Sequence, residues 1–346
     1  MKILLVKTCS LGDVVHTYAA ITDALQAVAD LEIHWLIEED YVGLAQLHPG
    51  IRKIIPVALR RWRRQPFNRE VRRQWRAFRQ TLRTETYEAV IDAQGLLKSA
   101  WLLRYIAAPS YGYDRQSVRE PLASLFYDHR IRVSQQLHAV ERTRQLVAKA
   151  LGYPLSGLAQ SGISAVAAPG AGPPDIGPEI WMLHGTTWRT KTWPESYWRQ
   201  LLEAMEERGV HSVLLYGNAE EQRRAERLAQ GLHYPRLQRP LSPGLLAQEL
   251  AQALAVVSVD SGLGHLAAAL GVPVLGLYGP TDTERTGIVG AYTLLPDLEC
   301  SPCLSRHCRR QPLPEASTPW PPCMARLRIE AVVAWVDRQR HTGRPA

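Results

Sequence analysis

The sequence predicts an α/β protein built from two Rossmann-like, doubly wound domains, and three observations support this fold class. In the first half, short apolar runs alternate with helical stretches, a pattern typical of parallel βαβ units. A Pro- and Gly-rich run over residues 167–178 suits neither a helix nor a strand and predicts a linker. The alternation then restarts, and the 346 residues exceed what one hydrophobic core usually holds, about 250–300 residues.

The individual elements follow from the apolar runs. In the first half we expect strands at 3–6, 32–37 and 89–91 and helices at 15–27 and 140–151. In the second half we expect strands at 180–184, 212–216, 255–259 and 272–279 and helices at 196–208, 220–231 and 263–270. The predicted domains are residues 1–166 and 179–324, and a last helix within 325–346 can pack back on the first domain.

Composition indicates an ordinary globular protein with an unusually high positive charge. Hydrophobic residues make up 46% of the chain and charged residues 21%, but the net charge is +8. The N-terminal segment is too short for a signal peptide, and no run reaches the ~18 uncharged apolar residues of a membrane-spanning helix. We therefore expect a cytosolic chain that can rest on a membrane surface.

The positive charge gathers in one element. Residues 60–83 contain ten arginines and one acid, Glu70. An apolar stripe at helical spacing is formed by Val71, Trp75, Phe78 and Leu82. The arginines occupy a different face, so the pattern predicts an amphipathic helix. That face is either solvated surface or a site for an anionic partner such as phosphate, carboxylate or anionic lipid. No nucleic-acid-binding motif accompanies it, and we expect no nucleic-acid partner.

Polar side chains follow the first predicted strand. Asp13 lies in the turn after it, near Lys7, Ser10 and His16. The G-x-G-x-x-G fingerprint is missing here, which counts against a dehydrogenase. An aspartate at the start of a helix is either a cap or, within hydrogen-bond reach of an acceptor hydroxyl, a general base. Both interpretations stay open from these residues alone.

Other polar groups of the first half follow the strand at 89–91. We expect Gln94 and Lys98 to point toward a cleft between the domains, and Arg119 and Arg142 add cations to the same domain. Ligands of doubly wound sheets bind outside the carboxyl ends of the strands. The first domain is therefore predicted to hold an anionic acceptor.

The second half presents groups suited to phosphate. Thr186, Thr187 and Lys191 follow the strand at 180–184, where two hydroxyls and an ammonium can hold phosphate oxygens. Glu221 follows the next strand and either stabilises the first turn of a helix or accepts hydrogen bonds from ribose hydroxyls. These turns predict that the second domain holds a nucleotide donor.

The turn at 258–265 is the most informative of the second half. It places Asp260, Ser261, Gly262 and Leu263 at the start of a helix, followed by His265. The N-terminus of a helix carries partial positive charge and unpaired N–H groups, which suit a phosphate or diphosphate. A simple Asp/Ser cap is the alternative.

The cysteines near the C-terminus form the pattern C-x₂-C-x₄-C-x₁₄-C. Its members are Cys300, Cys303, Cys308 and Cys323. The first spacings are plausible for a structural zinc site, whereas the last gap is loose. Free thiols or oxidation-prone pairs are the alternative.

Seven segments together resemble the ADP-heptose lipopolysaccharide heptosyltransferases, over nearly the whole chain. They are residues 6–17, 60–63, 90–99, 119–127, 138–144, 191–195 and 258–265. Segments 119–127 and 138–144 lean toward type I of the inner core. The sequence differs from the type I pattern at two places. Ser261 stands where the type I motif often has threonine, and the cysteine-rich segment is similar to the tail of other heptosyltransferases.

The resemblance implies a GT-B fold and an inverting glycosyltransferase. The enzyme would move L-glycero-D-manno-heptose from ADP-heptose to the inner Kdo of Kdo-lipid A, in lipopolysaccharide core synthesis. It would act as a peripheral protein on the cytoplasmic face of the inner membrane of a Gram-negative cell, against its anionic surface. No cofactor or catalytic metal is implied.

The same resemblance implies roles for individual residues. Asp13 would be the catalytic base. Donor-binding residues would be Thr186, Thr187, Lys191, Ser261, Gly262 and Leu263 at the diphosphate, Glu221 at the ribose, and Asp260 and His265 at the heptose. Residues contacting acceptor carboxylates and phosphates would be Arg60, Arg61, Arg63, Arg119 and Arg142.

Three alternatives compete with this hypothesis. A later-acting, type II-like heptosyltransferase would use an acceptor that already carries heptose. A nucleotide-sugar epimerase on the same fold would need acids and bases converging on the donor sugar, whereas Asp13 is predicted on the acceptor domain. A lipid-binding protein without activity would explain the arginine helix but not Lys191, Glu221 and Asp260 at successive strand ends.

Overall fold

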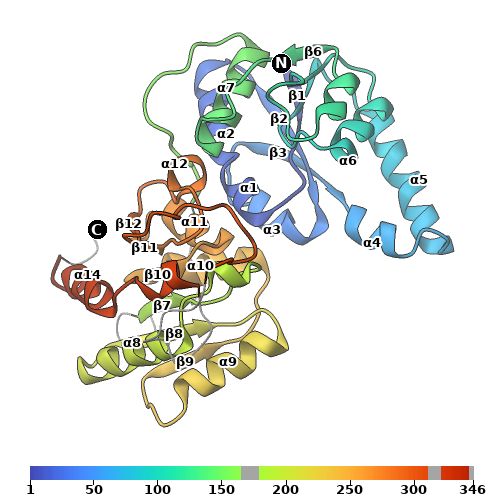
Figure 1. Cartoon of the computed structure of the whole chain (residues 1–346). Coiled ribbons are helices and arrows are strands. Elements are labelled where there is room, and N and C mark those ends of the chain that lie inside the picture. The colour runs from blue at the N-terminus through green and yellow to red at the C-terminus, as the bar shows by residue number, and fades with distance from the viewer. Residues whose placement is uncertain (165–178, 311–320, 343–346) are drawn as a thin grey trace. The chain divides into compact units, whose positions relative to one another are not determined.

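The computed structural model describes residues 1–164, 179–310 and 321–342. The chain divides into two compact units, Met1–Ser164 and Ala165–Ala346 (Figure 1). The predicted linker at 167–178 lies outside the described residues. Each unit is built around its own parallel sheet.

The first unit holds a six-stranded, all-parallel sheet in the order β3-β2-β1-β4-β5-β6. Its strands are β1 (Lys2–Val6), β2 (Glu32–Glu38), β3 (Ile51–Val57), β4 (Ala89–Asp92), β5 (Ser110–Tyr113) and β6 (His129–Ile131). The chain winds outward from β1 to β3 and then, from β4, outward to β6. Right-handed crossovers in opposite directions place helices on both faces of such a sheet.

The helical elements of this unit connect the strands. They are α1 (Leu11–Val15), α2 (Tyr18–Ala27), η1 (Glu39–Tyr41), α3 (Val42–Ala45), α4 (Leu59–Arg64), α5 (Arg69–Thr84), α6 (Leu97–Ala100), η2 (Trp101–Tyr105), η3 (Pro121–Phe126) and α7 (Ala139–Leu151). Helix α2 packs on α7. Helix α7 is capped at its C-terminus by Gly152, whose φ of +76° is the left-handed conformation that glycine adopts without strain.

Helix α5 confirms the predicted amphipathic element. Its N-cap Asn68 accepts hydrogen bonds from the backbone N–H groups of Glu70 and Val71. Val71, Phe78 and Leu82 are buried, and most of the arginines on the helix are exposed. The apolar stripe therefore holds the helix on the unit while its arginine face meets solvent.

The second unit repeats the plan with the order β12-β11-β10-β7-β8-β9. Its strands are β7 (Glu179–Leu183), β8 (His211–Leu215), β9 (Pro235–Gln238), β10 (Ala255–Val259), β11 (Val274–Leu277) and β12 (Tyr292–Leu294). Its helical elements are η4 (Arg189–Lys191), α8 (Glu195–Glu207), α9 (Ala219–Ala229), α10 (Pro243–Ala251), α11 (Gly262–Ala269), α12 (Thr283–Thr286), α13 (Pro322–Ala325) and α14 (Ile329–Thr342). The predicted doubly wound α/β architecture is thus confirmed in each unit.

The last helix packs within the second unit, where α14 contacts α8 (Figure 1). Val332, Trp335 and Val336 enter the core that Trp198 and Leu201 of α8 help to form. Burying this apolar face beside the sheet stabilises the helix by removing two or more large side chains from water.

Several elements escaped sequence analysis. The expected helix at 15–27 begins later, as α2, and the short helix α1 before it was not predicted. The edge strands β3, β6, β9 and β12 were not predicted either. Edge strands are short and only half-buried, so their hydrophobic pattern is weak. In the part of the chain that the structure describes, no helix is long and apolar enough to span a bilayer.

Candidate functional site

In each unit, two of the polar residues singled out from the sequence follow the strands at which the strand order reverses. This switch point lies between β1 and β4 in the first unit and between β7 and β10 in the second. The connections leaving the two strands there run to opposite faces of the sheet, which leaves a crevice at their carboxyl ends. Asp13 and Gln94 follow β1 and β4, and Lys191 and Asp260 follow β7 and β10.

Asp13 is fixed at the start of α1 by its neighbours. Its Oδ2 accepts hydrogen bonds from the Ser10 backbone N–H at 2.8 Å and the Ser10 hydroxyl at 3.1 Å. Lys7 Nζ lies 3.6 Å from Oδ1. Burial alone would raise the pKa of this carboxyl, but the Lys7 ammonium, the Ser10 N–H and His16 outweigh it, and the pKa lies below its ordinary value. Asp13 is therefore a carboxylate near neutral pH, the form that a general base requires.

Gln94 and Lys98 contact the same loop. Gln94 is buried, and its Oε1 accepts the backbone N–H groups of Thr8 and Cys9, each at 3.0 Å. Lys98 Nζ lies 2.9 Å from Cys9 Sγ. The structure thus gives Gln94 a supporting role, since its amide oxygen holds the β1–α1 loop that presents Asp13.

A buried carboxylate supports the turn that carries Gln94. Asp92 accepts the backbone N–H of Gln94 at 2.8 Å, the hydroxyl of Ser99 at 2.9 Å and that of Tyr127 at 2.8 Å. Burial raises the pKa of Asp92 despite these donors. Sequence analysis gave Asp92 no role, although its place at the end of a buried strand was a usable signal.

The α4 arginines lie beside the acids that follow β2. Arg61 Nε and Nη2 donate to the two oxygens of Glu39 at 2.8 and 2.9 Å. Arg60 Nη1 lies 3.7 Å from Asp40, and its guanidinium lies over the Tyr41 ring. Arg63 is exposed. These guanidinium groups form a basic surface at the end of β3, which suits anionic groups of an acceptor.

Arg142 and Arg119 lie near the β4 turn. Arg142 Nη2 donates to the Ser117 carbonyl at 2.5 Å, and its guanidinium lies 5.1 Å from the centre of the Tyr113 ring. The Tyr113 ring in turn borders Gly95, the residue after Gln94. Arg119 has an exposed side chain. Arg142 is thus held close to the Gln94 turn, whereas Arg119 extends into solvent.

In the second unit, Lys191 and Asp260 form the centre of the site. Lys191 Nζ lies 2.5 Å from Asp260 Oδ2, and both side chains are at least 85% buried. The Thr281 hydroxyl, which follows β11, donates to the same oxygen at 2.6 Å. Thr186 donates to the Asp260 carbonyl at 3.3 Å. Three strand ends therefore converge on one carboxylate and one ammonium.

Further groups surround this pair. The Lys191 ammonium lies 4.2 Å from the centre of the Trp188 ring, and the Arg306 guanidinium lies 4.8 Å from the same ring. Ser261 is the N-cap of α11, which begins at Gly262 and continues through Leu263. His265 is buried, and Thr187 is exposed. The α11 N-terminus directly follows Asp260, the partner of the Lys191 ammonium, and a helix N-terminus near a cation suits a diphosphate.

Glu221 lies in the first turn of α9, the helix that follows the neighbouring strand β8. Its Oε2 accepts the Gly217 backbone N–H at 2.7 Å. A Cβ added at Gly185 would lie only 2.9 Å from Glu221 Oε1, so glycine permits this close approach. The carboxylate therefore sits beside the β7 turn that carries Thr186, where it can accept hydrogen bonds from vicinal hydroxyls.

Comparison with known proteins decides the family. Residues 75–313 match the family model of glycosyltransferase family 9 (heptosyltransferase). The lipopolysaccharide heptosyltransferase 1 of Pseudomonas aeruginosa is 46% identical over 351 residues, 97% of each chain. That of Escherichia coli K12 is 44% identical over 299 residues, 84% of this chain and 91% of the relative. The chain belongs to glycosyltransferase family 9.

Solved structures agree with this assignment. The Escherichia coli heptosyltransferase WaaC with ADP has a TM-score of 0.84 and 38% identity, over 98% of this chain and 100% of that one. The same enzyme with ADP-2-deoxy-2-fluoro heptose has a TM-score of 0.81, 38% identity and coverage of 98% and 99%. Escherichia coli heptosyltransferase II, at 18% identity and a TM-score of 0.77 over 99% of each chain, shares the fold. The predicted heptosyltransferase family and GT-B fold are confirmed.

The four cysteines of this family 9 glycosyltransferase differ in exposure. Cys323 is buried in the second unit's core, whereas Cys303 and Cys308 are exposed and Cys300 is half-buried. Burial raises the pKa of the Cys323 thiol to about 11. Among the described residues, no group of three or more His, Cys, Asp or Glu side chains is placed to hold a metal ion.

Sequence analysis of this enzyme missed three contributors to the donor side. They are Thr281, Trp188 and Arg306. Thr281 had a usable signal, because it follows the apolar run at 272–279. Arg306 had none, because it lies in the cysteine-rich segment far from any strand end.

Proposed function

We propose that this heptosyltransferase moves L-glycero-D-manno-heptose from ADP-heptose to the inner Kdo of Kdo-lipid A, with inversion at the anomeric carbon. The observation that carries the proposal is the 46% identity to a heptosyltransferase 1 over 97% of both chains. The WaaC structures with ADP and with a fluorinated ADP-heptose support the donor. The type II alternative is less favoured, because the heptosyltransferase 2 of Haemophilus influenzae matches over only 28% of this chain.

In the proposed reaction, Asp13 takes the proton of the acceptor hydroxyl. The hydroxyl oxygen forms a bond to the anomeric carbon, and the bond from that carbon to the ADP phosphate oxygen breaks. ADP leaves with the electron pair. A carboxylate whose pKa lies below its ordinary value is ready to accept the proton throughout the neutral range.

The donor side stabilises the leaving ADP. Lys191, Thr186 and Thr187 would hold the diphosphate, together with the α11 N-terminus at Ser261, Gly262 and Leu263. Charge grows on the leaving diphosphate in the transition state, and preoriented cations and N–H groups lower its energy there. The diphosphate would compete with Asp260 for the Lys191 ammonium, which frees that carboxylate for the heptose hydroxyls. Glu221 would hold the ribose.

Inversion is tested on the product. We expect NMR of the purified product to show an anomeric configuration opposite to that of the donor heptose, since Asp13 activates direct displacement. A product with the donor's configuration would contradict single displacement and point to two successive displacements instead.

Removing Lys7 should change the pH dependence. Lys7 lowers the pKa of Asp13, so the Lys7→Met variant should have a higher Asp13 pKa. A base works in its ionised form, and activity is lost as pH falls through its pKa. The acid limb of kcat/KM should therefore shift to higher pH in Lys7→Met. The exposed Lys149→Met is the matched control and should keep the original profile. If the acid limb of kcat/KM did not shift in Lys7→Met, the ionisation of Asp13 would not be the cause of that limb.

The acceptor is a lipid, and we propose that the enzyme works on the cytoplasmic face of the inner membrane. The exposed arginine face of α5 supports this location, because each basic residue near an anionic membrane surface contributes about 1 kcal/mol. Charge reversal at Arg72, Arg73 and Arg76 to Glu should weaken vesicle binding at least tenfold. Binding to vesicles with and without anionic lipid measures the effect.

An equal charge reversal provides the control. Arg309, Arg310 and Arg328 are exposed residues of the second unit. Changing these three to Glu should weaken vesicle binding less than reversal on α5. Equal weakening by both triple variants would mean that net charge alone, and not the α5 face, controls membrane binding.

A further inference from the structure

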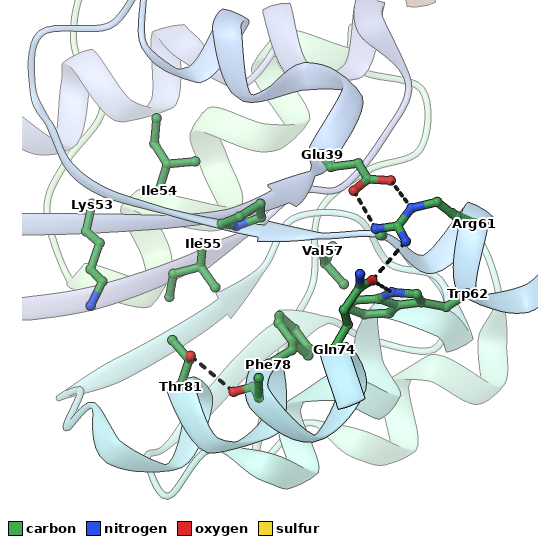
Figure 2. Close-up of a pocket in the computed structure, with 13 residues that line it drawn as sticks. Glu39, Lys53, Ile54, Ile55, Val57, Arg61, Trp62, Gln74, Phe78 and Thr81 are labelled. Atoms are coloured by element: carbon green, nitrogen blue, oxygen red, sulfur yellow. Dashed lines mark hydrogen bonds and ion pairs between the residues drawn. The ribbon is translucent and has the colours of Figure 1, made fainter. Parts of the chain in front are cut away.

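A groove in the first unit lies apart from the residues assigned above to proton transfer and to the leaving diphosphate. It runs between the edge strand β3 and helix α5 and has a volume of about 340 Å³ (Figure 2). Small-molecule sites range over roughly 300–1,000 Å³. Ile55 and Val57 line it from β3, and Phe78 and Ala77 line it from α5. Both long sides therefore carry apolar side chains, and α5 adds the polar Gln74 and Thr81.

Polar groups at the ends of the groove bond one another. At one end, Arg61 is paired with Glu39 and also donates to Gln74 Oε1 at 2.8 Å. Trp62 Nε1 donates to the same Gln74 oxygen at 3.0 Å (Figure 2). At the other end, Lys53 is paired with Glu85. An occupant of the groove therefore meets mainly apolar surface, which favours a hydrocarbon over a polar ligand.

The helix at the Arg61 end of the groove carries further cations. Arg60, Arg63 and Arg64 are exposed on α4, the helix that also carries Arg61 and Trp62. Phe67, between α4 and α5, is 83% exposed, with the Arg72 guanidinium 5.9 Å from its ring centre. An apolar groove bordered by an arginine-rich helix is complementary to an anionic amphiphile, with a charged headgroup and an apolar chain.

We propose that this groove binds an acyl chain of the lipid acceptor while the α4 arginines hold its anionic headgroup. The inference rests on the proposed function, which makes the acceptor an acylated, phosphorylated lipid. A protein strand added to the β3 edge fits less well. Pro56 and the charged Lys53 lie on β3, and proline and lysine both discourage edge-to-edge strand pairing.

A groove-filling substitution tests the proposal. Ala77 is exposed and lines the groove, so Ala77→Trp can fill it without entering the core. KM is measured for the acylated acceptor and for the same acceptor with its acyl chains removed. Each methylene displaced from apolar surroundings weakens binding about fourfold. We expect Ala77→Trp to raise KM for the acylated acceptor at least tenfold and to leave KM for the deacylated acceptor unchanged.

Gln80→Trp is the matched control, since Gln80 is exposed on α5 and does not line the groove. It should leave both KM values unchanged. Equal effects of Ala77→Trp on the two acceptors, or none on the acylated one, would overturn the proposal.

A binding measurement separates the groove from the activity. A fatty acid carrying a bromine quencher should reduce tryptophan fluorescence in the unaltered protein, and less in Trp62→Phe, because Trp62 lines the groove. Equal quenching in both proteins would overturn the acyl site. If the unaltered protein transfers heptose to neither acceptor, the proposed function fails. The quenching experiment then tests by itself whether the groove binds an acyl chain.

Discussion

Asp13→Asn should lower kcat by about 10²–10⁴-fold, the usual contribution of a general base, while the affinity for ADP-heptose stays unchanged. Asparagine keeps the size of the side chain and can still accept the Ser10 N–H that closes the α1 cap. It cannot take a proton from the acceptor hydroxyl. Steady-state kinetics measure kcat, and calorimetric titration measures donor binding.

The control for this variant is Asp30→Asn, at an exposed aspartate with a φ of +52° that asparagine tolerates well. It should keep full activity. If kcat of Asp13→Asn were within tenfold of that of the unaltered enzyme, Asp13 would not be the general base. Loss of donor affinity in the same variant would instead assign Asp13 to donor binding.

Lys191→Met should lower kcat/KM by about 10²–10³-fold, because it removes a preoriented cation from the leaving diphosphate. It should also lower the free energy of unfolding by about 3 kcal/mol, since Asp260 is left as a buried charge without its ion-pair partner. Kinetics and chemical denaturation measure the two effects separately.

The double variant Lys191→Met with Asp260→Asn separates the two effects. A neutral amide at position 260 can still accept the Thr281 hydroxyl, so most of the lost stability should return. Activity should stay low, because the cation is still missing. Recovery of activity together with stability would show that Lys191 only supports the fold.

Sequence periodicity predicted the scaffold wherever one element carries its own signal. Helix α5 is an example, since its Asn68 cap and its apolar stripe both lie within a short local segment. Strand β10, predicted at its observed bounds, is another, because a fully buried strand is a continuous apolar run. The strand ends then located Asp13, Lys191 and Asp260 without any knowledge of the fold.

Contacts between distant segments could not be predicted in the same way. Thr186 and Asp260 meet across 74 positions, and Gln94 supports the Thr8 amide across 86. The local hydrophobic pattern predicts that such residues follow strands. Whether they are neighbours depends on the order of the strands in the sheet, which the pattern does not give. The core against which α14 packs could not be predicted either, because an apolar helix face does not specify which core buries it. The groove beside α5 depends on the spacing of two elements and has no signal in either one.

The most direct test of the account is heptose transfer from ADP-heptose to Kdo-lipid A, run beside an acceptor that already carries one heptose. We expect product on Kdo-lipid A alone. Product only on the heptosylated acceptor would contradict it and assign the enzyme to a later step of core synthesis.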